Sequence, residues 1–242
     1  MRWITGIIIV AVVIIVITQL AASRDKEREA VKIAQEYLNQ KYEQEMIYQD
    51  IRKAPIEPGV YHVMFSSAKT PEIEFEVTVP NSLMLPERVL DFGRSDHSAD
   101  NYYYKHFEYQ MKKYLVEDVT RLWEDNATIR VTVMDISGFF TIPPELNDTM
   151  SIKEMDSIVS DYWVAITINN MPFDSKSVEV EASKIFEFIQ NIQNDGFSPE
   201  GISCRFISGK NSIDVVISNW RQMDTVAQVL EQLETGFEKV NK

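Results

Sequence analysis

Cysteine and histidine are scarce in this chain of 242 residues, which has one cysteine and three histidines. A single cysteine, Cys204, excludes an intramolecular disulfide and a metal centre made only of thiolates. In the stretch GISCRFIS, strand alternation puts Cys204 on one face together with Ile202 and Phe206. We therefore expect Cys204 to be a small buried hydrophobe.

The chain also lacks the short motifs that mark common catalytic folds. It contains no G-x-S-x-G elbow, no Walker loop, no G-x-G-x-x-G and no H-E-x-x-H. We therefore assign no catalytic residue, no cofactor-binding residue and no metal ligand. The sequence predicts a protein without enzymatic activity and without a cofactor.

One polar loop keeps an enzymatic alternative open. Histidine and carboxylate are ligands for zinc and manganese, and a loop rich in aspartate can close around a cation. The alternative function is an envelope metal-assisted hydrolase that uses this loop, around residues 91–106. Aspartate and serine are also common at turns and helix starts, which would explain the same residues without a metal. The residues concerned are Asp91, Asp96, His97, Asp100 and His106.

Clusters of basic residues are missing as well. The chain has 24 lysines and arginines against 37 aspartates and glutamates, a formal net charge of −13 at pH 7. Binding to phosphate backbones or to anionic lipid surfaces depends on clustered lysine and arginine. We therefore expect no nucleic acid partner.

The most apolar stretch lies near the N-terminus, where residues 3–23 carry no charge. As a helix, residues 4–22 would be roughly 28 Å long, close to the roughly 30 Å of bilayer hydrocarbon. We predict a single-pass transmembrane anchor over residues 1–23, in contact with the membrane through residues 4–22. A cleaved secretory signal that ends at Ala21-Ala22-Ser23 is the alternative.

Three stretches carry a resemblance to a known group of proteins: AQEYLNQKYEQE (residues 34–45), TPEIEFEV (70–77) and DNYYYKHFEYQM (100–111). They resemble small membrane-anchored or lipid-anchored extracytoplasmic proteins of Gram-positive bacteria, whose folds are similar to PepSY and cystatin-like domains. The resemblance covers about the first half of the soluble part. It transfers no functional residue, because those proteins have no assigned site.

The resemblance implies a cell-membrane protein whose soluble part is extracytoplasmic. Lysines and arginines that follow the apolar stretch outnumber those before it, which by the positive-inside rule favours a cytoplasmic soluble part. Short N-terminal anchors commonly precede an exported domain, and we follow the resemblance in expecting the outside. The basic residues after the stretch are Arg24, Lys26, Arg28 and Lys32.

Hydrophobic periodicity predicts an α+β fold, with an N-terminal transmembrane helix followed by two small α+β subdomains that have antiparallel sheets. Residues 24–125 form the PepSY/cystatin-like domain and residues 126–242 the second α+β domain. The second domain reads as βαβαββα, with a hairpin over residues 202–217 that turns at SGKN. The boundary near residue 125 coincides with no linker.

The stretch PEIEFEVTVP, residues 71–80, alternates glutamates with apolar residues. Pairing it with the preceding strand gives one wholly apolar face, and the glutamates then face solvent. The expected pairs are Phe65 with Ile73, Val63 with Phe75 and Tyr61 with Val77. We therefore interpret Glu72, Glu74 and Glu76 as a solvent-facing row and not as a metal or acid–base site.

A long helix is predicted after the polar loop, with Asp100 as its N-cap. Its core stripe consists of Tyr104, Phe107, Met111, Leu115, Val119 and Leu122. Tyr102 and Tyr109 lie off this stripe, and they are candidates for contact with a partner.

These observations favour a single-pass, membrane-anchored, non-enzymatic extracytoplasmic protein that binds an envelope protein or peptide. An exposed sheet edge could accept a partner strand through main-chain hydrogen bonds. The identity of the partner and the oligomeric state do not follow from the sequence.

Overall fold

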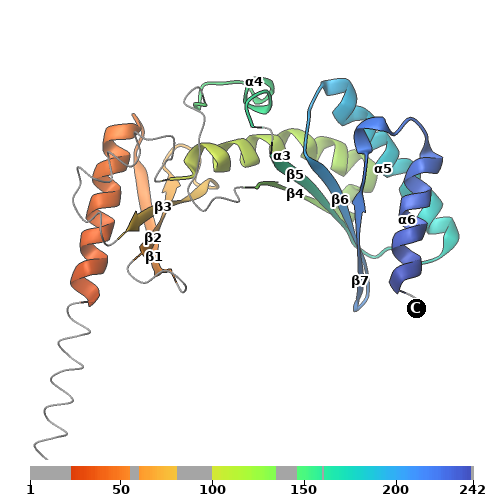
Figure 1. The fold of residues 1–242 in the computed structure, drawn as a ribbon, viewed down its shortest axis with the longest axis horizontal. Helices are drawn as coiled ribbons and strands as arrows, with labels where there is room; N and C mark the ends of the chain where they lie inside the picture. Colours follow the sequence, from red (N-terminus) through yellow and green to blue (C-terminus); the bar gives the residue numbers. More distant parts are fainter. Residues whose placement is uncertain (1–22, 55–59, 81–99, 135–145, 160, 241–242) are drawn as a thin grey trace, which may run out of the picture. The chain divides into compact units, whose positions relative to one another are not determined.

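The structure is a computed structural model that describes residues 23–54, 60–80, 100–134, 146–159 and 161–240. The described residues form two compact units, the first up to Tyr102 and the second from Tyr103 onward. Each unit combines helices with a sheet, which confirms the α+β class (Figure 1). The units divide near Tyr102 and not near residue 125, because the long helix that follows packs its aromatic side chains into the second unit.

The first unit consists of a helix over residues 23–41 and a three-stranded antiparallel sheet in the order β1-β2-β3. The strands are β1 (Met46–Lys53), β2 (Val60–Ser67) and β3 (Glu74–Pro80). Figure 1 shows the helix beside the three strands. As its three- and four-residue spacing predicts, the helix buries one stripe. The stripe consists of Ala30, Ile33, Ala34, Tyr37 and Leu38.

Strands β2 and β3 pair two residues away from the predicted register. The observed pairs are Phe65 with Phe75, Val63 with Val77 and Tyr61 with Val79. In the predicted register Ser67 would lie opposite Pro71, which has no N–H to give to the ladder. In the structure the Ser67 N–H instead donates to the Ile73 carbonyl at 3.2 Å. A shift of two residues keeps every side chain on its own face, so the apolar face is unchanged.

The faces of β3 are those that the alternation predicts. Phe75 is fully buried and Glu74 is exposed. Glu72 is exposed in the loop before the strand. Glu76 is half-buried, and its Oε1 lies 2.6 Å from Nδ1 of His62. The prediction of a buried apolar face opposite a polar face is therefore confirmed for this strand.

Asp100 is buried in the first unit just before the next helix, and its carboxylate accepts a hydrogen bond from the N–H of Tyr102, the first residue of that helix, at 3.0 Å, in keeping with the predicted cap. The Asp100 carboxylate also accepts hydrogen bonds from the Tyr37 and Tyr42 hydroxyls and the Lys41 ammonium, each at 2.7 Å. Burying a lone charge is costly, and such charge-assisted partners offset that cost. Tyr102 is 2% exposed and packs edge-on against Phe75, so the prediction that Tyr102 faces a partner is wrong.

The second unit follows the predicted order βαβαββα after helix α3. Its main elements are α3 (Tyr102–Trp123), β4 (Ala127–Val133), α4 (Ile152–Asp156), β5 (Tyr162–Ile168), α5 (Ser175–Asp195), β6 (Gly201–Ser208), β7 (Asn211–Ile217) and α6 (Val226–Val240). Short 3₁₀ turns η2 (Glu124–Asn126) and η3 (Trp220–Gln222) follow α3 and β7.

The sheet of the second unit has the order β4-β5-β6-β7 and is mixed. The prediction of purely antiparallel sheets is wrong here, because β5 and β6 run parallel. Helix α5 lies between these two strands in the chain, and it provides the long crossover that parallel neighbours require. The hairpin β6–β7 is antiparallel and turns at residues 209 and 210, as predicted.

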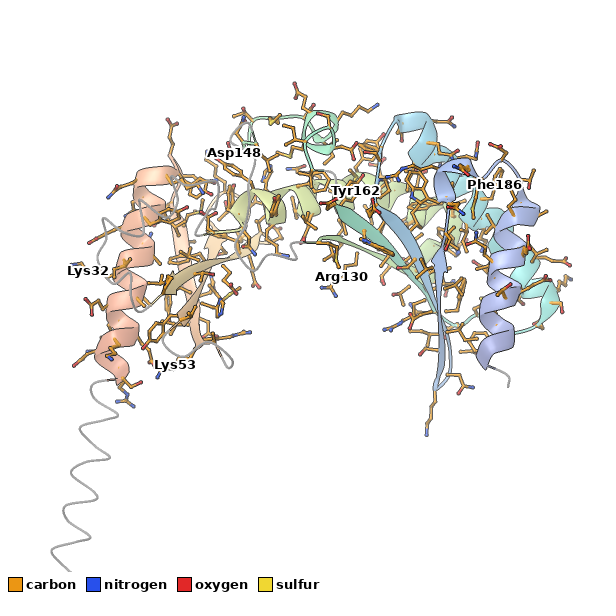
Figure 2. All side chains as sticks on the ribbon, viewed as in Figure 1. Lys32, Lys53, Arg130, Asp148, Tyr162 and Phe186 are labelled. Carbon is orange, nitrogen blue, oxygen red and sulfur yellow. The ribbon has the colours of Figure 1, made fainter. Side chains whose placement is uncertain are left out.

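One face of this sheet is buried under helices and the other face is more exposed and mixes polar with apolar side chains. Along β5 and β7 every second side chain is buried, and the side chains between them are more exposed. Arg130 of β4 lies on the more exposed face (Figure 2). Cys204 is fully buried, as predicted, and burial raises the pKa of its thiol to about 12. The thiol therefore stays protonated at neutral pH.

Among the described residues, no helix is long and apolar enough to cross a membrane. The predicted span, residues 4–22 of the anchor 1–23, lies outside the described part of the chain.

Replacing Phe75 by alanine should lower the free energy of unfolding of the first unit by about 3–5 kcal/mol, the usual range for a buried phenylalanine. The control Glu74→Gln should change it by less than about 1 kcal/mol, because Glu74 faces water. Amide hydrogen exchange of β2, followed by mass spectrometry, reports this unit separately. A larger effect of Glu74→Gln than of Phe75→Ala would mean that the buried face has been assigned wrongly.

Candidate functional site

The predicted metal loop cannot be assembled from the described residues. Asp91, Asp96 and His97 lie outside the described part, and Asp100 is held by the tyrosines and the lysine of the first unit. His106 is buried in the second unit, where burial lowers its pKa although Asp148 opposes the shift. No group of three His, Cys, Asp or Glu side chains that could hold a metal occurs among the described residues. The hydrolase alternative stays a prediction.

A cavity of about 300 Å³ lies beside the C-terminal end of α3, and its most buried charged group is Glu181. The Glu181 carboxylate accepts hydrogen bonds from the Trp123 indole N–H and the Lys184 ammonium. The contact with Trp123 ties α3 to α5. Both oxygens of the Glu181 carboxylate are thus already bonded.

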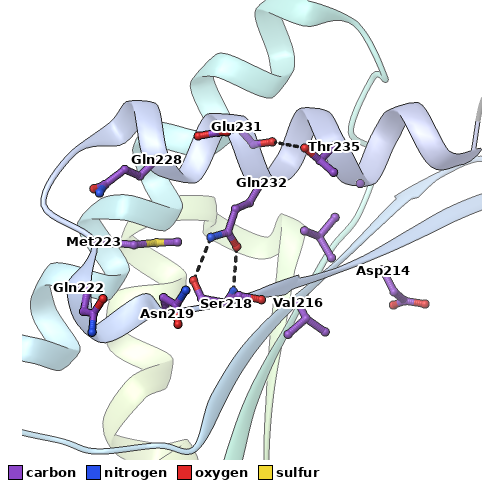
Figure 3. Close-up of a pocket in the computed structure, with 12 residues that line it drawn as sticks. Asp214, Val216, Ser218, Asn219, Gln222, Met223, Gln228, Glu231, Gln232 and Thr235 are labelled. Atoms are coloured by element: carbon purple, nitrogen blue, oxygen red, sulfur yellow. Dashed lines mark hydrogen bonds between the residues drawn. The ribbon is translucent and has the colours of Figure 1, made fainter.

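A larger groove of about 800 Å³ lies between the edge strand β7 and helix α6, with η3 at one end (Figure 3). Half of its lining residues are polar and uncharged, and none is basic. The lining residues are Asp214, Val215, Val216, Ser218, Asn219, Gln222, Met223, Gln228, Glu231, Gln232, Thr235 and Gly236.

Helix α6 forms one wall of the groove because its apolar stripe holds it against the sheet. Val229, Leu233 and Phe237 are buried, and Phe237 packs against Phe206 of β6 at 5.3 Å between ring centroids. The helix approaches β7 closely at Gly236. A Cβ atom at that position would lie 2.6 Å from Cγ2 of Val215, so only glycine allows this spacing without movement.

The other wall is the free edge of β7. Its two-residue turn has Gly209 at the first central position with φ +61°, the requirement of a type II′ hairpin. In such a turn Asn211 bonds back to Ser208, so odd-numbered residues of β7 point their backbone groups toward β6. The backbone groups of Ser212, Asp214 and Val216 therefore point toward the free edge. Within the described residues no other strand pairs with this edge.

Just beyond β7, a side chain takes the place of a partner strand. The Gln232 carboxamide donates to the Ser218 carbonyl at 2.9 Å and accepts from the Ser218 N–H at 2.8 Å (Figure 3). A strand residue makes the same pair of contacts in an antiparallel ladder. Asn219, with φ +55°, then turns the chain into η3 and ends the edge.

The two acidic side chains of the groove differ in their surroundings. Asp214 accepts two hydrogen bonds from Arg205 of β6, at 2.7 and 2.9 Å, which hold its pKa below the usual range. Glu231 is exposed on α6, and no ion pair to its carboxylate exists within the described part of the chain. The only contact drawn from Glu231 in Figure 3 is that of its backbone carbonyl, which accepts from Thr235.

Comparison with known proteins gives little guidance. No protein-family model matches the chain, and no curated protein matches it. Among solved structures, a DUF5037 family protein from Ruminococcus gnavus ATCC 29149 is similar, with a TM-score of 0.42 and 13% identity over 86% of this chain and 99% of that protein. Similarity at this level supports no conclusion about function.

The contact between Gly236 and Val215 predicts that the effect of Gly236→Ala on the free energy of unfolding changes sign when Val215 is replaced by alanine. Gly236→Ala should destabilise the second unit by about 1–3 kcal/mol, because the added methyl group overpacks a filled site. In a Val215→Ala background the same change should stabilise it by up to about 1 kcal/mol, since alanine is the better helix former. Urea unfolding followed by the fluorescence of buried Trp220 measures both. Equal effects in the two backgrounds would show that this contact does not set the distance between α6 and β7.

Proposed function

We propose that the chain is a non-enzymatic, single-pass, membrane-anchored extracytoplasmic protein that binds an extended segment of another envelope protein in the groove between β7 and α6. The partner segment adds as a further strand to the free edge of β7. The observation that carries this proposal is the paired contact of Gln232 with both backbone groups of Ser218.

Backbone geometry favours an extended segment over a compact ligand. Ser212, Asp214 and Val216 recur at every second residue of an uninterrupted register, so their outward N–H and C=O groups form an evenly spaced row. Only another extended backbone matches such a row along its whole length. Helix α6 adds a wall against which the side chains of the partner can rest.

The edge of β3 is less accessible than that of β7. Val77 forms a bridge with Asp100, and the neighbouring Asn101 N–H donates to the Glu76 carbonyl at 3.2 Å. The Asn101 carboxamide in turn accepts from the Glu76 N–H at 2.8 Å. The chain thus covers part of the β3 edge itself, so β7 is a better docking edge than β3.

Three observations support the remaining parts of the proposal. The uncharged run over residues 4–22 has the length of a membrane span. The resemblance to anchored Gram-positive proteins favours an extracytoplasmic soluble part. In the part of the chain that the structure describes, no group of three His, Cys, Asp or Glu side chains could hold a metal.

Strand addition predicts that Val216→Pro abolishes partner binding while the fold survives. Proline removes an N–H that points away from β6, and edge strands tolerate proline at such positions. A photo-crosslinking residue at Gln222, in the groove, should capture a partner in intact cells from the parent chain and from the control Val216→Thr, but not from Val216→Pro. The same crosslinker at exposed Glu179 of α5 gives the background. Identical adducts with Val216→Pro would contradict docking at this edge.

The proposed orientation predicts that protease added to intact cells, after removal of the cell wall, digests the soluble part. The expected result is loss of the domain with the cytoplasmic controls intact, detected with an antibody against the C-terminal half. Full protection in intact cells, with digestion only after lysis, would place the soluble part in the cytoplasm.

A further inference from the structure

We infer that the partner segment carries a lysine or arginine which pairs with Glu231, and that Gln232 fixes where the added strand ends. This inference rests on the proposed strand addition at β7, and it names the chemical class and the register of the segment. It follows from the charges of the groove and from the contact that closes its edge.

The charge of the groove is negative and partly uncompensated. Its lining includes two carboxylates and no lysine or arginine. Arg205 already neutralises Asp214 through two hydrogen bonds, so Asp214 contributes little net field. Glu231 remains as the carboxylate available to a ligand, on the α6 wall and exposed to solvent. A cationic side chain that leans from an added strand toward α6 complements it.

The whole chain strengthens this preference. The formal net charge is −13, so basic segments approach the surface more readily than acidic ones, and an acidic segment is repelled. An exposed ion pair changes affinity by up to about fivefold, and salt weakens it. The charge therefore selects among extended segments, whereas the backbone row provides the docking itself.

Gln232 sets the end of the added strand. Its carboxamide occupies both edge groups of Ser218, so a partner backbone can pair with Ser212, Asp214 and Val216 but not with Ser218. A segment of about five residues spans the open row, since facing strands advance equally. Removing the Gln232 carboxamide frees the N–H and C=O groups of Ser218 to pair with one further residue of the partner. At Asn219 the chain turns away from the edge.

The test uses the full chain in nanodiscs of zwitterionic phosphatidylcholine and blocked, fluorescein-labelled peptides of alternating Thr and Val, read by fluorescence anisotropy. Nine-residue peptides carry Lys, Gln or Glu at the centre. We expect the Lys peptide to bind about 3–5-fold tighter than the Gln peptide at low salt, and the Glu peptide to bind weakest. Glu231→Gln should reduce the Lys preference to less than twofold. The control Glu234→Gln, an exposed residue of α6 outside the groove lining, should retain it.

Peptide length tests the role of Gln232. Gln232→Ala should tighten binding of the nine-residue Lys peptide by about two- to threefold, the small net gain of one further backbone pair, and leave the affinity of a five-residue Lys peptide unchanged. If the ratio of the affinities of the two peptides is the same in Gln232→Ala as in the parent chain, Gln232 does not determine where the added strand ends. Equal affinity for the Lys, Gln and Glu peptides would overturn the inference that the partner segment is basic. The proposed strand addition would still stand.

Failure of the proposed function has a different signature. Two peptide sets, N-methylated at the even or at the odd residues, keep their side chains but each lose the N–H groups of one edge. If both sets bind as strongly as the parent peptide, strand addition is excluded. If no peptide binds and the chain is a dimer that Val216→Pro dissociates, a second copy of the chain occupies the edge, and the basic segment is overturned with it.

Discussion

The free edge of β7 is the constraint on which the second unit depends, because a strand at the edge of a sheet leaves a row of backbone donors and acceptors unpaired by its own sheet. The chain satisfies this row at one point, where Gln232 bonds both groups of Ser218. Natural edges are often protected by charges, bulges or proline. Between residues 211 and 217 the register of β7 has no bulge and the sequence has no proline. The edge is therefore regular enough to receive another strand.

The order of the elements in the chain produces this edge and its wall together. Crossover helix α5 makes β6 parallel to β5, and the tight hairpin then adds β7 on the outside of β6. The chain returns through η3 and α6, whose apolar stripe anchors it over the buried face beside β7. The absence of a side chain at Gly236 lets α6 approach Val215, which brings Gln232 within hydrogen-bonding distance of Ser218. The groove is a consequence of packing that the core requires in any case.

Alternation predicts the burial of Phe75 and Cys204, because the face of a strand follows from its period, whereas Tyr102 lies off the predicted helical stripe and is buried all the same. Period does not determine register: a slip of two residues keeps every face, so the β2–β3 pairing was predicted two residues out. The tyrosine and lysine partners of Asp100 are some 60 residues away in the chain, and local pattern cannot report them. The groove was equally hidden, since a glutamine and a glycine in an amphipathic helix signal only an exposed site and a weak helix former. The length of α5 is typical of a crossover between parallel strands, so the parallel pair β5–β6 has a signal in the sequence.

Main-chain pairing at such an edge fixes the register of an added strand more than it contributes to the free energy of binding. Each outward residue of β7 can make two hydrogen bonds, each worth about 0.5–1.5 kcal/mol net. Ordering the two partner residues that accompany it costs about 1–2 kcal/mol each for the backbone alone. The free energy of these hydrogen bonds and the cost of ordering nearly cancel, so a flexible segment gains little binding free energy from the edge itself. Tight binding therefore requires a segment already held extended by its own protein, side chains that use the α6 wall, or confinement of both partners to one membrane. The proposed anchor would supply the last of these, because tethering raises effective concentration without adding a contact.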